Sequence, residues 1–192
     1  METNVMTPEK SLQIINEAIE KSRKDFEKNA GSPMIIWGVV VLVFSVAVWI
    51  MLTLTGNLNW NFLWFGIPVI GFPLTSILLK GKCKEGGESF ISKTLGQIWA
   101  AYGIFAMVLS AVFAFIAPQF TGYIITVLLG FSAVMTGFVL KNNWITAGGF
   151  ITGLGCTVAL FFSRNEFVPL YFSAASILNL VVPGIMMNKR AK

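Results

Sequence analysis

The sequence predicts an all-α, polytopic membrane protein with six transmembrane helices arranged as three hairpins, preceded by a cytoplasmic amphipathic helix. Three observations predict this class. The 192-residue chain is 55% hydrophobic and only 12% charged, whereas soluble domains are roughly 25% charged. Six uncharged apolar runs are each long enough for the roughly 20 helical residues that cross a bilayer core. The basic residues, finally, gather on one side of these runs.

The amphipathic helix is expected over residues 8–29. Thr7 can cap its N-terminus, and Pro8 suits the first helical turn. Apolar residues at helical spacing define a docking or partner face, made of Leu12, Ile15, Ile19 and Phe26. Acidic and basic residues balance along this helix, so its attraction to anionic lipid should be weak. The face could dock on the protein's own cytoplasmic side, pair with another helix or lie on the membrane, and an unstructured arm is a further alternative.

The segment Asn29–Pro33 is predicted to end this helix and to begin the next one. Gly31 suits a left-handed C-terminal cap, and Ser32 and Pro33 suit the start of a new helix. The sequence therefore predicts two units, a cytoplasmic amphipathic helix with its hinge over residues 1–32 and a six-helix transmembrane domain over residues 33–192.

The six apolar runs form three similar hairpins. Each hairpin begins near a tryptophan (Trp37, Trp99 or Trp144) and closes on a lysine, which is typical of residues at a membrane interface. The expected spans cover residues 34–55, 60–79, 95–116, 121–140, 144–163 and 167–187.

The loops set the expected orientation. Of the 14 lysines and arginines, only Arg164 falls in a predicted outer turn. These outer turns are short, as at Pro118–Gln119. Because basic residues are enriched in cytoplasmic loops, both termini are expected in the cytoplasm. Orientation explains the net charge of +5, and no nucleic-acid binding is expected.

Two spans have a distinctive composition. The second contains two glycines and two prolines, including Pro68 and Pro73, which predict a kink; broken helices form substrate sites in some transporters, although kinks are common in membrane helices. The fifth is rich in small residues and contains a GxxxG pair, Gly149 and Gly153, which predicts close helix packing at the centre of the bundle or a dimer contact.

Reactive groups are missing from the predicted spans. The chain has no histidine, and no aspartate or glutamate lies within a span, so neither a metal site nor an acid–base pair is expected. We therefore expect no enzyme, no cofactor and no metal. Gln97 and Asn179 are expected to form interhelical hydrogen bonds, although such groups could also bind a neutral solute.

Two resemblances follow from the layout. The hairpin containing Trp99, Tyr102–Gly103 and Ala117–Pro118 resembles small six-span bacterial membrane proteins of the acid-resistance type. The segment Asn29–Gly38 (Asn-Ala-Gly-Ser-Pro-Met-Ile-Ile-Trp-Gly) resembles uncharacterised six-span membrane proteins of Bacteroidota. Both resemblances imply a bacterial inner membrane, and neither brings catalytic residues.

The predicted function is that of a non-enzymatic multi-pass membrane protein with a structural or regulatory role. Apart from the lipid bilayer, its partner would be a cytoplasmic protein or another copy of the chain in a homo-oligomer, contacted through the amphipathic helix. The alternative is a small neutral-solute transporter or channel, for which the second span is the motivation.

Overall fold

The computed structural model describes residues 7–80, 90–117, 120–162 and 167–190. Every secondary-structure element in these ranges is helical, so the all-α prediction is confirmed there. The outer turns at Pro118–Gln119 and around Arg164, as well as residues 1–6, lie outside the described residues. The elements, in chain order, are α1 (Pro8–Thr55), η1 (Leu58–Phe65), α2 (Gly66–Leu78), α3 (Phe90–Ile116), α4 (Thr121–Leu140), α5 (Asn143–Phe162), α6 (Val168–Ser176), η5 (Ile177–Val181) and α7 (Val182–Arg190).

Five helical segments of the described chain are long and apolar enough to cross a membrane. They are α1, the η1–α2 rod, α3, α4 and the continuous α6–η5–α7 rod. The fifth predicted span also forms a helix, α5, but it is not among these five. Large apolar side chains cover the outside of the bundle, with Phe90, Phe115 and Ile116 among the most exposed. Such an apolar exterior is unfavourable in water and favourable against lipid chains, which indicates a membrane protein.

α1 is a single helix of 48 residues, and the predicted break at Asn29–Pro33 is wrong. The Thr7 side chain caps its N-terminus as expected, accepting a hydrogen bond from the backbone N–H of Lys10. Gly31 is helical and lies where α7 crosses α1, since a Cβ built on it would come 2.8 Å from the carbonyl oxygen of Gly184. Pro33 stands inside the helix, as proline can when neighbouring helices support the chain.

The second span begins as a 3-10 helix and becomes α-helical at Gly66. Pro68 falls in the first turn of α2, and Pro73 stands inside the helix. The two glycines of this span face α1, because a Cβ on Gly66 would clash with Phe44 and one on Gly71 would clash with Trp37. These two glycines therefore let the second span pack closely against α1.

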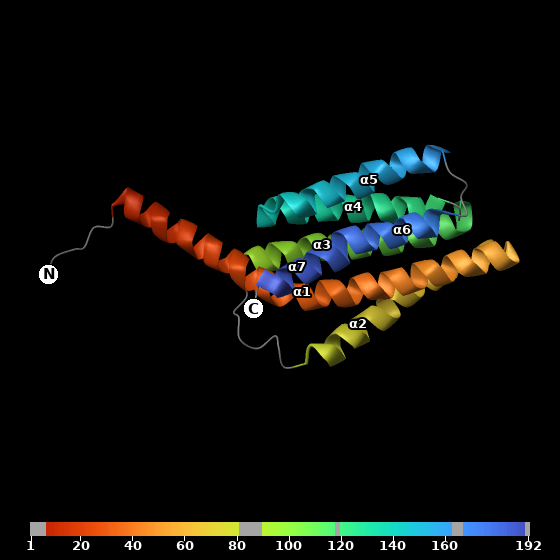
Figure 1. The fold of residues 1–192 in the computed structure, drawn as a ribbon, viewed down its shortest axis with the longest axis horizontal. Coiled ribbons are helices and arrows are strands. Elements are labelled where there is room, and N and C mark those ends of the chain that lie inside the picture. Colours follow the sequence, from red (N-terminus) through yellow and green to blue (C-terminus); the bar gives the residue numbers. More distant parts are fainter. Residues whose placement is uncertain (1–6, 81–89, 118–119, 163–166, 191–192) are drawn as a thin grey trace.

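α5 does not lie at the centre of the bundle. α1 contacts α2, α3, α6, η5 and α7, whereas α5 packs chiefly against α4 and forms one outer edge (Figure 1). The prediction of a central fifth span is therefore wrong. α4 and the α6–η5–α7 rod are the most buried membrane-length segments in the described chain, and the aromatic pair of Trp64 and Phe172, with ring centroids 5.0 Å apart, belongs to their core.

Candidate functional site

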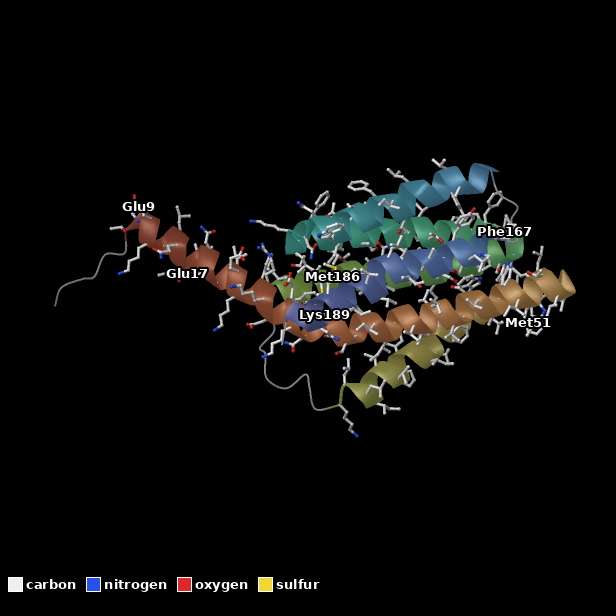
Figure 2. The ribbon with its side chains drawn as sticks, viewed as in Figure 1. Glu9, Glu17, Met51, Phe167, Met186 and Lys189 are labelled. Carbon is white, nitrogen blue, oxygen red and sulfur yellow. The ribbon has the colours of Figure 1, made fainter. Side chains whose placement is uncertain are left out.

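Residues 8–29 of α1, which we call the arm, extend beyond the rest of the bundle (Figure 1). Three of the four predicted partner-face residues are well exposed on it: Leu12 is 62% exposed, Ile15 54% and Ile19 41%. They lie one helical turn apart, so they form a continuous apolar stripe. Glu9 and Glu17 mark the same projecting segment in Figure 2.

Phe26, the fourth member of the predicted face, has a different environment. It is partly buried and packs against the core cluster that includes Ala30, Leu140 and Met187. The stripe therefore continues along the helix from a bundle-facing end at Phe26 to an unpartnered end at Leu12. Docking on the protein's own bundle is found for Phe26, and the more distal three residues have no such cover in the described chain.

Polar contacts on the arm stabilise the helix from its other faces. Gln13 donates to the Glu17 carboxylate at 2.9 Å, and Arg23 forms an ion pair with Glu20. Pairs at this spacing contribute about 0.2–0.5 kcal/mol each to a helix. These contacts leave the apolar stripe clear of charge.

The arm joins the bundle through close contacts of α1 with α7 and with η5. The backbones meet at Gly31 and Gly184, and a Cβ on Gly38 would come 3.2 Å from the backbone nitrogen of Val181. Asn188 lies next to this crossing, with its amide nitrogen 3.5 Å from the Ser32 hydroxyl. Small residues at these positions allow the helices to approach, and they couple the base of the arm to the C-terminal helix.

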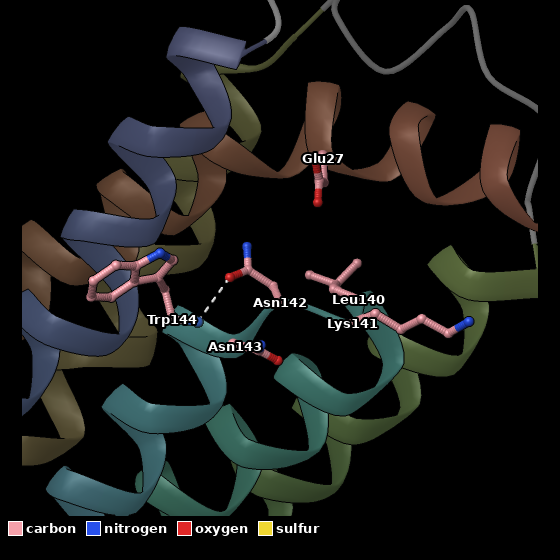
Figure 3. A pocket seen from close by; sticks show the side chains of 6 residues that line it. All are labelled: Glu27, Leu140, Lys141, Asn142, Asn143 and Trp144. Atoms are coloured by element: carbon pink, nitrogen blue, oxygen red, sulfur yellow. Dashed lines mark hydrogen bonds between the residues drawn. The ribbon is translucent and has the colours of Figure 1, made fainter.

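The arm also faces the turn between α4 and α5. α4 ends at Leu140, and its C-cap residue Lys141 has a φ of 50°, in the left-handed region. The Asn142 side chain caps α5 by accepting a hydrogen bond from the backbone N–H of Trp144 at 3.1 Å. Glu27 of the arm lies opposite this turn (Figure 3), and a cleft of about 250 Å³ separates them. Sequence reasoning missed this cleft because Glu27 and the turn are far apart in the chain.

Among the described residues, one buried hydrogen bond joins the side chains of two different helical elements. The Asn179 amide donates to the Thr152 hydroxyl at 2.7 Å, which confirms the predicted interhelical hydrogen bond, whereas Gln97 is exposed. Asn179 lies in the short π-helix η5, and its own carbonyl oxygen Oδ1 has no hydrogen-bond partner. Pro183, four residues later, cannot donate to the Asn179 backbone carbonyl, which explains a π-helix at this place.

The two glycines of the predicted GxxxG pair have unequal surroundings. A Cβ on Gly149 would come 2.6 Å from the backbone nitrogen of Val134 and 2.8 Å from the carbonyl oxygen of Gly130. A Cβ on Gly153 would meet Gly130 only at 3.7 Å, which is ordinary contact. The structure places both at the α4–α5 contact, where Gly149 is the tighter position.

Several groups in the described residues can hydrogen bond or carry charge, and they do not form one reactive cluster. The buried hydroxyls of Ser45, Thr126 and Thr136 donate to carbonyl groups of their own helices.

In comparisons with family models, with curated proteins and with solved structures, the chain has no match.

Proposed function

We propose that the protein is a non-enzymatic, multi-pass protein of the bacterial inner membrane with a structural or regulatory role. Its arm contacts a cytoplasmic protein through Leu12, Ile15 and Ile19. The observation that carries this proposal is the exposure of these three residues on a helix that continues directly into the bundle. Exposed apolar side chains in a stripe are a common mark of a helix that binds in a groove of another protein.

The orientation is supported by where the basic residues gather. Lys141 lines the cleft opposite Glu27, and Lys189 follows Asn188, which lies beside Ser32. The end of the bundle from which the arm leaves is therefore the basic end. A basic end is typical of the cytoplasmic side, so the arm and both termini would be cytoplasmic.

A surface-lying arm is less well supported than a projecting one. A helix that lies in the plane of the membrane interface has to bend before it can continue into a helix that crosses the bilayer. In α1 the helix continues through Asn29–Pro33, and it directs the arm away from the bundle. The balance of acidic and basic residues along the arm also favours a protein partner over anionic lipid.

Site-specific photo-crosslinking in native membranes would test this proposal. A benzophenone would be attached to cysteine at Leu12, Ile15 or Ile19, in a chain whose Cys83 and Cys156 are replaced by serine. Lys21 and Lys24 are matched controls, since both are exposed and neither belongs to the apolar stripe. Protein adducts at the three stripe positions and none at the controls are expected. Adducts with lipid alone would contradict the proposal.

The neutral-solute alternative has weaker support. The second span suggested a solute site, but its two glycines are packed against Phe44 and Trp37 of α1. The buried hydroxyls described above donate within their own helices. Asn179 Oδ1 and Thr121 Oγ1 are the buried side-chain atoms of the described spans that have no hydrogen-bond partner, and only they favour a solute contact.

A further inference from the structure

The cleft between the arm and the α4–α5 turn carries charges of both signs. Glu27 lies on the α1 side and Lys141 on the turn side, and polar groups fill most of the remaining wall. In the described chain the Glu27 carboxylate and the Lys141 ammonium take part in no ion pair, with each other or with another residue. The lining residues are Glu27, Leu140, Lys141, Asn142, Asn143 and Trp144.

The Glu27 side of the cleft suits a hydrogen-bonding cation. The Asn142 carbonyl oxygen Oδ1 accepts from the backbone N–H of Trp144, so its amide nitrogen is turned toward Glu27 (Figure 3). This amide can orient the carboxylate without neutralising it. An unneutralised carboxylate at the edge of a cleft binds most strongly to a group that brings both positive charge and N–H donors.

The Lys141 side suits an anion. Lys141 is exposed, and its side chain points away from Glu27 (Figure 3). It occupies the left-handed position that ends α4, where glycine or asparagine is the usual residue. The backbones of the two residues are fixed on two helical elements, and the flexible Lys141 side chain can bring its ammonium to the mouth of the cleft.

The cleft also lies at the proposed border between lipid and cytoplasm. Trp144 is 75% exposed at the start of α5, and an indole ring in this position is typical of the headgroup level. Lys141 ends the neighbouring helix at the same level. Phospholipid headgroups are therefore the molecules present at this cleft in the greatest amount.

We propose that the cleft binds the headgroup of a phosphatidylethanolamine molecule, with its primary ammonium group at Glu27 and its phosphate at Lys141. The inference rests on the membrane placement proposed above. A choline headgroup offers the carboxylate no N–H donor, and the glycerol group of phosphatidylglycerol brings hydroxyl donors but no positive charge to Glu27. Glu27 belongs to the arm, so the bound lipid would fix the base of the arm against the α4–α5 turn.

Native mass spectrometry of the full chain in detergent would test the assignment. Phosphatidylethanolamine, phosphatidylcholine and phosphatidylglycerol would be added separately and together, and the bound fractions compared. We expect the ethanolamine lipid to be retained about fivefold more than either of the others, which is the size expected for an exposed charged contact. Equal retention of the three lipids would overturn the proposal.

Two variants on opposite sides of the cleft keep the test independent of folding. E27Q should lower ethanolamine lipid retention to the level of the choline lipid, and K141N should lower retention of all three lipids, because asparagine tolerates the left-handed backbone and lacks the charge. E17Q, on the arm but away from the cleft, is the matched control and should behave as the unmodified chain. Unchanged retention in E27Q, with an unchanged melting temperature, would contradict the proposal.

Competition with the free headgroup shows whether the ligand is a membrane lipid or a soluble compound that carries the same phosphoethanolamine group. Glycerophosphoethanolamine in excess should displace the bound lipid if the cleft recognises the headgroup. Binding of this soluble compound as strong as that of the whole lipid would make it the ligand and overturn the lipid assignment. Failure of these lipid measurements would leave crosslinking at Leu12, Ile15 and Ile19 unaffected, so the two proposals can be distinguished.

Discussion

Gly31 of α1 and Gly184 of α7 meet so closely that a Cβ on either would come 2.8 Å from the carbonyl oxygen of the other. No side chain fits between the two backbones at this point. The contact lies at the base of the arm, two residues before Pro33. It explains why a segment with every local signal of a helix end remains helical, since α7 packs against that segment and holds it in place.

Alanine at Gly31 or Gly184 should therefore destabilise the protein. Adding a methyl group to a packed contact typically costs about 1–3 kcal/mol, and this cost should exceed the gain of up to about 1 kcal/mol in helix propensity. Thermal unfolding in detergent, followed by circular dichroism, would measure the change. Gly96→Ala in α3 is the matched control, because a Cβ there meets nothing within 4 Å. A control as destabilised as G31A would contradict this explanation.

The α4–α5 contact gives a second glycine prediction. Gly149→Ala should lower stability, because the new methyl group would meet the backbone of α4 at 2.6–2.8 Å. Gly153→Ala, with its nearest neighbour at 3.7 Å, should be close to neutral. Unfolding in a mixed-detergent titration would compare them. Equal losses in the two variants would show that the GxxxG pair acts as a symmetric contact, against the geometry described here.

The buried contact between Asn179 and Thr152 should contribute measurably to stability. Thr152→Val keeps the shape of the side chain and removes the acceptor at 2.7 Å, so we expect a loss of about 0.6–1.7 kcal/mol, as for other hydrogen bonds between membrane helices. Thr53→Val is the matched control, since the Thr53 hydroxyl is exposed and donates only to its own helix.

A double-mutant cycle separates the hydrogen bond from packing effects. With Asn179→Leu in place, T152V should cost much less than it does alone, because the donor is gone. The free energy of unfolding would be measured for all four chains. Additive losses would mean that the two side chains do not interact in the folded protein.

Much of the fold could be predicted from the sequence because apolar length and periodicity determine membrane-length helices. The predicted span 121–140 coincides with α4, and Thr7 caps α1 as expected. The errors arose where tertiary contacts outweigh local signals. A glycine at position 31 fits a helix cap and a close contact between two helices equally well, and only the position of Gly184 in the fold decides between them.

The candidate sites were predictable in part for the same reason. Exposure of Leu12, Ile15 and Ile19 follows the amphipathic pattern, but the burial of Phe26 depends on where the bundle ends. Glu27 and Asn142 come together only through the folding of α1 beside the α4–α5 turn, and no local pattern predicts such a cleft. Small residues in α5 predicted close packing, but they could not show that α5 packs chiefly against α4 at an outer edge of the bundle.

The central claim is that α1 carries the arm out of the bundle as one unbroken helix, and a distance across Pro33 tests it most directly. Spin labels at Glu17 and Val43, both exposed, would be separated by 26 helical residues, or about 39 Å at roughly 1.5 Å per residue. Pulsed electron–electron double resonance would be measured on the full chain in lipid nanodiscs, with both native cysteines replaced by serine. The distribution of label-to-label distances should be single and narrow, centred near that value. A broad distribution, or one centred well below it, would mean that the chain bends at Asn29–Pro33 and would contradict the account.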